Sequence, residues 1–333
     1  MSGVDVVIPC FNYGHYLRAC AASVLSQQGV QVRAVIIDNA STDQTPEIAL
    51  ELVSRDPRIE YRRHAVNQGH IASFNEGLDW AKADYTVVLP ADDLLSADAL
   101  SRAARLLDGN PDVGLCYGRD IIFENQEALC HIAGCENYRW KIIGGAEFLQ
   151  EVAAGGDINM CATVVRTSLQ RKIGGYRPEL PNVCDVDMWA RFAVHGSIAR
   201  LDCCQGFFRK HADNMSLECR GKLKAYQQLA TTFDLLFQHY RDRIENAEQL
   251  EAEAKRLIAW RAFWAASHLF NQGDVDGCQE ILPFVTALYP DVRSSPAWFR
   301  WQLKRLLGAK SWSLLRPVVG WLRRVRYSEL AAG

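Results

Sequence analysis

The sequence predicts an α/β protein whose mostly parallel sheet is flanked by helices and followed by an all-helical C-terminal domain. In the first 115 residues, short apolar runs rich in β-branched residues alternate with segments of helical periodicity. Strands that are apolar on both faces and separated by helices are typical of a parallel sheet covered on both sides. At 333 residues, the chain is long enough for one large domain and a smaller one.

Periodicity and turn residues place the individual elements. The expected strands are residues 4–8, 32–37, 59–63, 85–89 and 199–201, and the expected helices of the sheet domain are residues 16–27, 45–55, 71–82 and 186–195. Four further helices are expected at residues 223–240, 245–270, 275–289 and 297–307. The change of texture near residue 216 predicts a sheet domain over 1–215 and a helical domain over 216–333.

Composition excludes several classes of protein. With 49% hydrophobic residues, a net charge of -2 and a pI near 6.5, the chain is globular and has no general attraction to nucleic acid. Its 11 cysteines are odd in number and contain no C-x-x-C pair, which favours reduced thiols over disulfides or zinc. No apolar run approaches the length of a membrane span, and no leader pattern precedes the first strand. We expect a cytoplasmic location.

Candidate ligand-binding residues follow the first two strands, because open α/β sheets bind ligands at the carboxyl ends of their strands. The turn from Pro9 to Tyr13 offers backbone groups and aromatic faces but lacks the glycine patterns of dinucleotide or P-loop sites. The second strand is followed by Asp38 and, further on, Asp43. A carboxylate there can accept hydrogen bonds from a base or ribose. Alternatively, Ser41, Thr42 or Asp43 caps the helix that starts near Pro46.

Two adjacent carboxylates follow the strand at residues 85–89, in the segment Pro90-Ala91-Asp92-Asp93. Neighbouring carboxylates are costly to hold together unless a cation neutralises them, and oxygen ligands of this kind suit Mg²⁺ or Mn²⁺ bridging phosphates. The alternative is that Asp93 caps the next helix while Asp92 is solvated. Taken alone, the segment does not distinguish a metal site from a helix cap with a solvated neighbour.

The order of these segments is more specific than any one of them. The series V-x-x-P-x-F-N, I-I-D-N-A-S-T-D, N-x-G and A-x-x-D-Y-x-x-x-L-x-x-D-D resembles the family 2 glycosyltransferases over about 215 residues. The resemblance implies a GT-A fold, a nucleotide-diphosphate sugar donor (UDP-sugar first), inverting transfer of a hexosyl or N-acetylhexosaminyl group, and Mn²⁺ or Mg²⁺ as cofactor. The nucleotide-binding positions it implies are Pro9, Phe11, Asn12, Tyr13, Asp38, Asp43, Asn67, Gly69, Ala91 and Asp92.

The metal site that the resemblance implies has one departure. Asp92 matches the last Asp of the family's D-x-D, whereas Pro90 stands where its first Asp usually lies. The site is therefore one usual carboxylate short, and Asp93 is the expected substitute. Near the end of the sheet domain, Phe208-Arg209-Lys210-His211 and then Asn214-Met215-Ser216 resemble the family's R-x-H…S segment. This implies that His211 completes the metal site, with Arg209 and Lys210 as alternative contacts of the departing diphosphate.

The general base is expected in the second half of the sheet domain. The segments Gly174-Gly175-Tyr176 and 184–189 resemble the family's G-G-[FY] and E-D-x-D-x-W, with Cys184 replacing the first acid. The resemblance gives Asp185 the role of base, which is required because a hydroxyl is a poor nucleophile near neutral pH. Helix capping is the alternative for Asp185, and a salt bridge or a helix-start role is expected for Asp187. Gly175, Tyr176 and Trp189 are the expected neighbours of the diphosphate or acceptor.

Three functions remain open at this point. The first is transfer of a sugar to a hydroxyl of a glycan or lipid-linked acceptor, in bacterial-type surface polysaccharide synthesis. The second is a non-catalytic nucleotide-sugar-binding or scaffold protein of a glycan assembly complex, suggested by Pro90 and the incomplete E-D pair. The third, a nucleotidyltransferase, predicts a glycine- and lysine-rich loop after the first strand, which residues 10–15 do not provide.

The C-terminal segment is basic and apolar. From Trp301 to Gly333, seven Lys or Arg residues oppose Glu329 alone and alternate with Trp and Leu. Such a segment can lie on an anionic membrane surface, which would make the protein peripheral to the inner face of a membrane. The alternatives are a helix that packs on its neighbours with a solvated basic face, or a contact between copies in a homo-oligomer.

Overall fold

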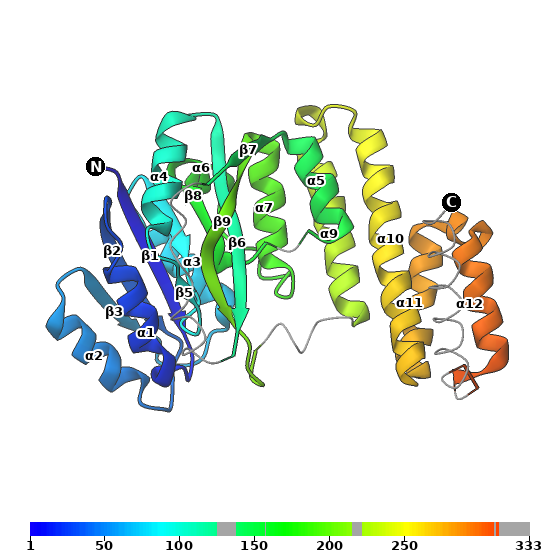
Figure 1. Ribbon diagram of the computed structural model, residues 1–333, viewed down its shortest axis with the longest axis horizontal. Coiled ribbons are helices and arrows are strands. Elements are labelled where there is room, and N and C mark those ends of the chain that lie inside the picture. The colour runs from blue at the N-terminus through cyan, green and yellow to red at the C-terminus, as the bar shows by residue number, and fades with distance from the viewer. Residues whose placement is uncertain (125–137, 157, 215–221, 310, 313–333) are drawn as a thin grey trace, which may run out of the picture.

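A twisted α/β sheet domain carries a row of helices on one side. The computed structural model describes residues 1–124, 138–156, 158–214, 222–309 and 311–312. In Figure 1 the first strands lie at one end, the sheet and its covering helices occupy the middle, and the C-terminal helices extend to the other end. The predicted α/β class with a C-terminal helical part is confirmed.

The described residues contain one nine-stranded sheet of order β3-β2-β1-β4-β8-β6-β9-β5, with β7 paired to β9. Its strands are β1 (Gly3–Cys10), β2 (Gln31–Asp38), β3 (Ile59–Arg63), β4 (Tyr85–Val88), β5 (Leu94–Leu95), β6 (Val113–Phe123), β7 (Trp140–Ile143), β8 (Thr163–Arg166) and β9 (Ser197–Arg209). All pairs in the β3-β2-β1-β4 half are parallel. In the other half, β6 and β9 are parallel while β8, β5 and β7 pair antiparallel with their neighbours.

Helices cover both faces of this sheet. The helices of the described residues, including those beyond the sheet, are α1 (Gly14–Leu25), α2 (Thr45–Arg55), α3 (His70–Trp80), α4 (Ala99–Gly109), α5 (Gly145–Ala154), α6 (Thr167–Ile173), α7 (Cys184–His195), α9 (Leu223–Tyr240), α10 (Ala247–Gln272), α11 (Val275–Leu288) and α12 (Pro296–Leu307). Short 3₁₀ turns occur at Met160–Ala162, Arg241–Arg243 and Pro290–Ser294. The expected helices at 45–55 and 223–240 have the observed bounds, whereas β9 extends well beyond the expected 199–201.

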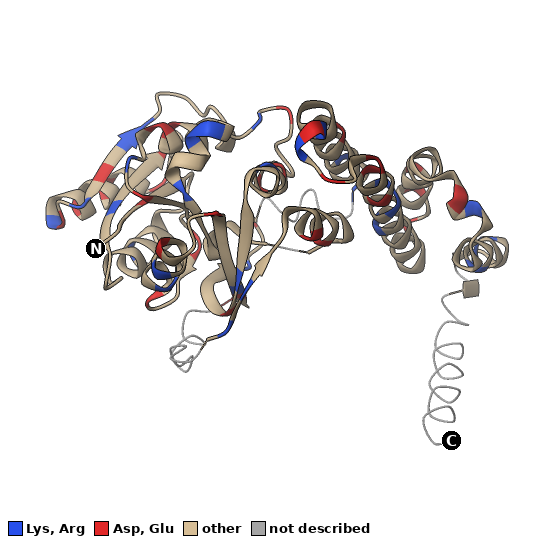
Figure 2. Ribbon diagram, turned by 90° about the horizontal axis from the view of Figure 1, so that it is seen from above, with Lys and Arg blue, Asp and Glu red and all other residues tan. Residues whose placement is uncertain are grey.

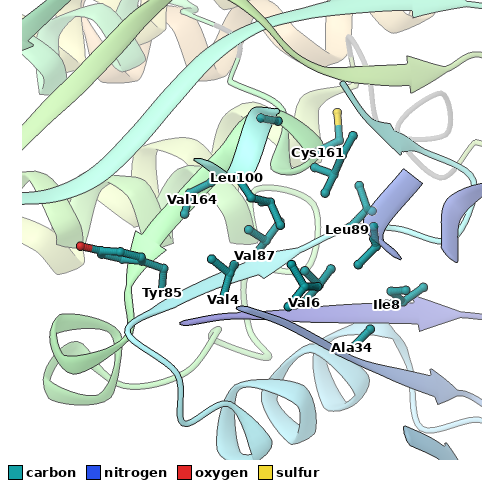
Figure 3. Packing of buried hydrophobic residues seen from close by; sticks show 14 of the residues in the cluster. Val4, Val6, Ile8, Ala34, Tyr85, Val87, Leu89, Leu100, Cys161 and Val164 are labelled. Atoms are coloured by element: carbon teal, nitrogen blue, oxygen red, sulfur yellow. The ribbon is translucent and has the colours of Figure 1, made fainter. Parts of the chain in front are cut away.

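Alternation along the strands divides the interior into two cores. Val4, Val6 and Ile8 of β1 pack with Leu17 of α1 and with α4 on one face, together with the residues drawn in Figure 3. Val7 faces the opposite side, where α3, α5 and α7 supply the second core. Successive side chains of a strand point to opposite faces, so a strand buried on both sides needs a continuous apolar run. The sequence of β1 meets that requirement.

The C-terminal helices belong to two cores. Leu250, Ala254 and Ile258 in the first half of α10, together with α9, are part of the second core of the sheet domain. The second half of α10 packs with α11 and α12 around a third core that includes Phe263 and Trp301. Helices α9 and the start of α10 therefore cover α5 and α7, and the boundary at residue 216 stays a prediction. Within the described ranges, no helix is both long and apolar enough to cross a membrane.

The contact between α3 and β1 depends on Gly77. A Cβ atom built on Gly77 would lie 2.0 Å from Cγ1 of Val7. We predict that Gly77→Ala lowers the free energy of unfolding by about 1–3 kcal/mol, because the helix would have to move off the strand. Gly109→Ala is the control, since a Cβ atom on Gly109 would meet nothing within 4 Å. Denaturant unfolding of both variants measures the difference, and equal stabilities would contradict the proposed close packing.

Candidate active site

A cavity of about 400 Å³ lies at the carboxyl ends of β1 and β4. It is lined by residues from segments that are far apart in the sequence. They are Pro9, Cys10, Phe11, Tyr13, Asn39, His70, Ser73, Phe74, Pro90, Asp92, Asp93, Asn159, Met160, Pro181, Asn182, Cys184, Asp185, Phe208 and Asn214. The structure thus brings Asp92 and Asp93, which follow β4 as the strand-end rule predicts, to one cavity with Asp185 of α7.

The two adjacent carboxylates after β4 have different surroundings. The turn is held to β1 by a hydrogen bond from the Ala91 amide to the Pro9 carbonyl. Oδ2 of Asp92 lies 3.0 Å from Nε2 of His211. Oδ1 of Asp93 accepts a 2.8 Å hydrogen bond from the Arg209 amide. Burial, and next the charge of Asp92, raises the pKa of Asp93 well above its usual range. Asp93 therefore anchors the turn, whereas the Asp92 carboxylate faces His211.

His211 is positioned by a residue to which the sequence motifs gave no role. Oδ1 of Asn214 accepts a 2.6 Å hydrogen bond from the His211 amide, and its Nδ2 donates to the Arg209 carbonyl at 3.1 Å. The same Nδ2 lies 3.2 Å from His211 Nε2 and 3.4 Å from Asp92 Oδ2. Asn214 is buried and lines the cavity, whereas His211 lies beside it in contact with Asp92. The R-x-H…S segment was the available signal, but it pointed to Ser216, which lies outside the described residues.

These residues fit a divalent cation that is shared with a substrate. Asp92 and His211 offer one carboxylate oxygen and one imidazole nitrogen 3.0 Å apart, close enough to bind the same ion. Among the described residues, no group of three or more His, Cys, Asp or Glu is arranged to hold a metal. Mg²⁺ commonly binds through one or two carboxylates and completes its shell with substrate phosphates. The site suits an ion that arrives with a diphosphate.

Arg209 supports the site from behind instead of facing the cavity. Its guanidinium carbon lies 4.3 Å from the ring centre of Tyr16 and 4.4 Å from that of Phe123. Its Nε donates to the backbone carbonyl of Asp92 at 2.8 Å. Lys210 is exposed and pairs with Glu124 at 3.2 Å. Neither lines the cavity, so the structure gives no support to the expected diphosphate contacts of Arg209 and Lys210.

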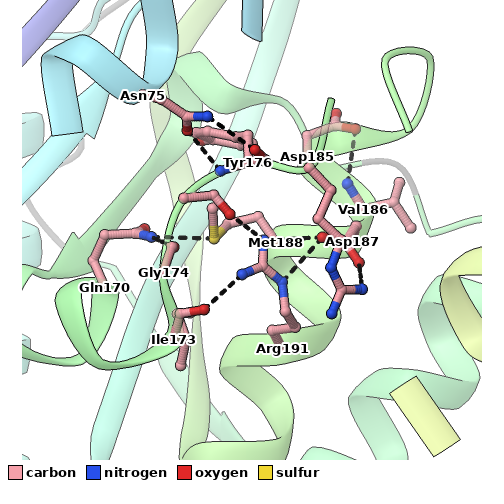
Figure 4. A network of polar contacts seen from close by, with 12 residues as sticks. Asn75, Gln170, Ile173, Gly174, Tyr176, Asp185, Val186, Asp187, Met188 and Arg191 are labelled. Carbon is pink, nitrogen blue, oxygen red and sulfur yellow. Dashed lines mark hydrogen bonds and ion pairs between the residues drawn. The ribbon is translucent and has the colours of Figure 1, made fainter. Parts of the chain in front are cut away.

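Asp185 lies in the first turn of α7 and lines the cavity. Its Oδ1 accepts a 2.8 Å hydrogen bond from the Val186 amide, as Figure 4 shows. Unpaired amides and the helix dipole favour a negative charge at this position. Val183 is the N-cap of α7 and no side chain caps the helix, so the capping alternative for Asp185 is not observed. The Asp185 side chain binds an amide within the first turn and also faces the cavity.

Asp187 is fully buried and forms the salt bridges expected for it. Its Oδ1 accepts from Arg177 at 2.8 Å and its Oδ2 accepts from Arg191 Nε at 3.0 Å. Arg191 also donates to the carbonyls of Ile173 and Gly175, both at 2.8 Å. In Figure 4 this network lies beneath the start of α7. The expected salt bridge of Asp187 is confirmed.

Three expected neighbours of the acceptor lie outside the cavity lining. The Asn75 side chain accepts from the Tyr176 amide at 2.7 Å and donates to the Tyr176 carbonyl at 2.9 Å. Tyr176 and Trp189 are buried, and a Cβ on Gly175 would lie 2.6 Å from Asn75 Oδ1. None of the three lines the cavity. The Gly174-Gly175-Tyr176 turn packs α3 against α7, and these positions do not support acceptor contacts.

The turn after β1 supplies much of the cavity wall. Pro9, Phe11 and Tyr13 line it, and Phe11 is 42% exposed. Asn12 has a φ of 58° and ties this turn to the next strand end, since its amide donates to Ser41 Oγ and its Oδ1 accepts from the Thr42 amide. The structure therefore brings three of the four expected residues of this turn to the cavity, and Asn12 shapes the turn behind them.

The carboxylates after β2 do not line the cavity. Asp38 is fully buried and accepts hydrogen bonds of 2.8 Å from the Ser41 amide and the Tyr61 hydroxyl. Asp43 accepts from the amides of Gly14 and Thr45, both at 3.0 Å. Burial raises the pKa of Asp43, but the hydrogen bond from the Thr45 hydroxyl and those from the two amides outweigh that effect and lower it. Asp43 thus stabilises the starts of α1 and α2, which is the capping alternative, and base contacts of Asp38 and Asp43 stay predictions.

The N-x-G segment supports the site indirectly. Asn67 Oδ1 accepts from Asn39 Nδ2 at 2.8 Å and from the Gly69 amide at 2.9 Å. Asn67 and Gly69 do not line the cavity, but Asn39 and His70 do. His70 lies 3.0 Å from the Pro181 carbonyl through Nε2, and burial lowers its pKa. His70 is therefore neutral near pH 7.

Asn39, His70, Asn159 and Asn182 are cavity residues that the sequence did not reveal. Asn39 lies within the I-I-D-N-A-S-T-D segment and His70 directly follows the N-x-G segment, so these motifs provided a signal for both residues. Asn159 and Asn182 lie where the alternation of strands and helices breaks down, and no pattern marked them.

The fold and the cavity, an α/β sheet with a hollow of about 400 Å³ bordered by acidic residues at its strand ends, are compatible with a transferase that uses a nucleotide-linked donor. Residues 5–140 match the family described as glycosyl transferase family 2. The resemblance that the order of the motifs indicated is confirmed over this part of the chain.

Curated relatives agree with the assignment. A glycosyltransferase of Haemophilus influenzae, itself uncharacterized, is 31% identical over 99 residues, covering 30% of this chain and 40% of the relative. An uncharacterized protein of Mycobacterium tuberculosis is 26% identical over 207 residues, covering 59% of this chain and 63% of the relative. The hyaluronan synthase of Pasteurella multocida is 23% identical, covering 66% of this chain and 21% of the synthase. The chain thus spans less than two thirds of the length of these relatives.

Solved structures show the same fold. S. aureus TarS 1-349 superimposes with a TM-score of 0.59 at 15% identity, covering 86% of this chain and 83% of TarS. The mannosyltransferase PcManGT of Pyrobaculum calidifontis, in complex with GDP-Man and Mn²⁺, has a TM-score of 0.54 at 16% identity, covering 93% of this chain and 86% of PcManGT. The expected GT-A type of fold is confirmed.

Comparing substitutions of Asp185 and Asp187 tests which of the two carboxylates stabilises the fold. We predict that Asp187→Ala lowers the free energy of unfolding by about 3–5 kcal/mol, because it leaves two arginines without their buried partner. Asp185→Ala, two residues away in the same helical turn, is expected to cost about 0.3–1 kcal/mol, the typical value of an acidic side chain in the first turn of a helix. Thermal and urea unfolding compare the two. A larger loss for Asp185→Ala would contradict the assigned roles.

Proposed function

We propose that this protein is an inverting glycosyltransferase that moves a sugar from a nucleotide diphosphate to a hydroxyl of a glycan or lipid-linked acceptor. The observation that carries the proposal is that Asp92 and Asp185 line the same cavity although they come from the turn after β4 and from α7. One carboxylate is paired with His211, and the other lies at a helix N-terminus. Because the two carboxylates have different partners, we assign Asp92 to metal binding and Asp185 to proton transfer.

Asp185 is the proposed general base. An attacking hydroxyl must lose its proton as it bonds to the anomeric carbon, and a carboxylate facing the cavity can accept that proton. The glycosidic bond forms as the bond to the diphosphate oxygen breaks on the opposite face of the sugar, so the configuration inverts. The Val186 amide fixes one oxygen of Asp185. The buried pairs of Asp187 with Arg177 and Arg191 hold the helix that carries it.

Asp92 and His211 are the proposed ligands of Mn²⁺ or Mg²⁺. When bound, the ion supplies positive charge that stabilises the diphosphate leaving group. The chain's part is to hold the two side chains together: Asn214 orients the loop of His211, and Arg209 fixes the backbone of Asp92. Pro90 leaves this region without a second carboxylate at the usual place, and buried Asp93 is already hydrogen-bonded to Arg209. We infer that substrate oxygens complete the coordination.

The donor end of the cavity is the wall formed by Pro9, Phe11, Tyr13 and Asn39. Aromatic and apolar faces beside an amide suit a nucleobase and ribose. TarS 1-349 is described in complex with UDP-GlcNAc, and PcManGT with GDP-Man. We propose a UDP-sugar for this chain, and a panel of UDP- and GDP-sugars in a thermal-shift assay tests that choice. A role in surface polysaccharide synthesis and a cytoplasmic site of action are part of the same proposal.

A non-catalytic nucleotide-sugar-binding protein is the second candidate. It is favoured by Pro90 and by the small number of metal-binding side chains among the described residues. Both candidates predict donor binding, but only the transferase predicts release of the nucleoside diphosphate. Donor turnover measured with and without Mn²⁺ separates them.

Asp185→Asn tests the proposed base. We expect turnover to fall by about 10²–10⁴-fold, the usual contribution of a general base, while the donor binds with unchanged affinity. Asp276→Asn is the matched control, since Asp276 lies in the first turn of α11 and is not part of the cavity lining. Nucleotide release and calorimetric donor binding are the two measurements. Turnover near that of the wild type in Asp185→Asn would refute the assignment.

Asp92→Asn and His211→Ala test the proposed metal ligands. We expect each to weaken binding of Mn²⁺ in the presence of UDP by roughly 10-fold or more, because each removes one of two protein ligands. Electron paramagnetic resonance of free Mn²⁺ measures binding without any need for turnover. Glu124→Gln is the control, because this acid is exposed and paired with Lys210. Unchanged Mn²⁺ binding in both variants would exclude this pair as the metal site.

A further inference from the structure

Helix α12 has apolar side chains on two opposite faces. Trp301 is 4% exposed and packs into the third core with Trp298. On the other side, Phe299, Leu303 and Leu306 are 60%, 61% and 79% exposed, and Leu307 is 47% exposed. Positions i, i+4, i+7 and i+8 fall on one face of a helix. In Figures 1 and 2, α12 lies at the end of the molecule away from the sheet, so no described element covers this outer face.

The same part of the sequence has an extreme charge. Residues 292–328 contain nine Lys or Arg and no Asp or Glu. The rest of the chain therefore contains 28 of the 37 Lys and Arg and all 39 Asp and Glu. The remainder of the chain therefore carries a net charge of -11. Within α12, Arg300 and Arg305 are exposed, while Lys304 reaches inward to Ser267 at 3.1 Å. The outer apolar face is thus bordered by positive charge.

We propose that the outer face of α12, formed by Phe299, Leu303, Leu306 and Leu307, docks on an anionic lipid surface. Apolar side chains enter the boundary between headgroups and acyl chains, while neighbouring Lys and Arg are attracted to acidic headgroups. A second copy of the chain fits less well, because pairing two such faces would bring their positive charges together. Nucleic acid fits less well too, because phosphates offer no partner for four exposed apolar side chains.

This inference is independent of the proposed transferase activity, since it concerns a surface distant from the cavity. It also explains why α12 carries apolar residues that its own core does not use. The docking would present the basic end of the molecule to the membrane and leave the acidic body in solution.

Vesicle flotation of the full chain tests the proposal. Wild-type protein is expected to float with vesicles of phosphatidylcholine and phosphatidylglycerol, to stay in solution with phosphatidylcholine alone, and to bind less as salt is added. Phe299→Gln/Leu303→Gln/Leu306→Gln should weaken binding to the mixed vesicles by more than about tenfold, since three apolar side chains no longer leave water. These side chains are exposed, so thermal unfolding should remain near that of the wild type.

The matched control is Leu50→Gln/Val66→Gln/Ile122→Gln, which changes three apolar residues of similar exposure outside α12. It should float like the wild type. Absence of flotation for the wild type, or equal flotation of the α12 variant, would overturn the proposal. Sedimentation velocity tests whether the face instead joins two copies of the chain. If the wild type is a dimer and the α12 substitutions convert it to a monomer without changing vesicle binding, the face is a contact between copies and the proposal is wrong.

Discussion

The hydrogen bonds between the turn after β4 and the end of β9 are the constraint on which the site depends. The Arg209 amide binds the Asp93 carboxylate, and the Arg209 side chain binds the Asp92 carbonyl. The guanidinium is held between Tyr16 and Phe123, so this cation is fixed by packing as well as by hydrogen bonds. Asp92 can then point its carboxylate toward His211. Without this connection, two adjacent acids would not remain ordered at the end of a buried strand.

The second half of the site depends on a separate network. Asp187 pairs with Arg177 and Arg191 inside the protein, and Arg191 also binds carbonyls of the turn before α7. A buried carboxylate with two arginines is stable only when all its partners are present. This network fixes the first turn of α7 and therefore the position of Asp185 at the cavity. The site thus has two carboxylates, Asp92 and Asp185, each positioned by its own network of hydrogen bonds and ion pairs.

The sequence predicted strands and helices well where local patterns determine structure. Strands β1, β2 and β4 are rich in apolar residues that become buried, so their runs were visible in the sequence. Asp92 and Asp185 lay near the ends of predicted elements. It predicted less where a side chain's direction depends on distant partners. Arg209 and Trp189 belong to motifs that suggested ligand contacts, yet their side chains are buried by Tyr16, Phe123 and the second core. Asp38 and Asp43 follow a strand as expected, but local amides take up their oxygens. The direction of these side chains can be seen only in the folded structure, because it is set by residues that are distant in the sequence or by local backbone amides.

Asp92 and His211 are the proposed place where donor diphosphate and cation meet, at the cavity that Asp185 also lines. The most direct measurement is a crystal structure of the full chain with Mn²⁺ and UDP, in which anomalous scattering locates the manganese. We expect the anomalous peak in contact with Asp92 and His211, with the diphosphate beside it and the base against the wall of Phe11 and Tyr13. A manganese peak away from both residues, or UDP bound outside this cavity, would contradict the proposed site.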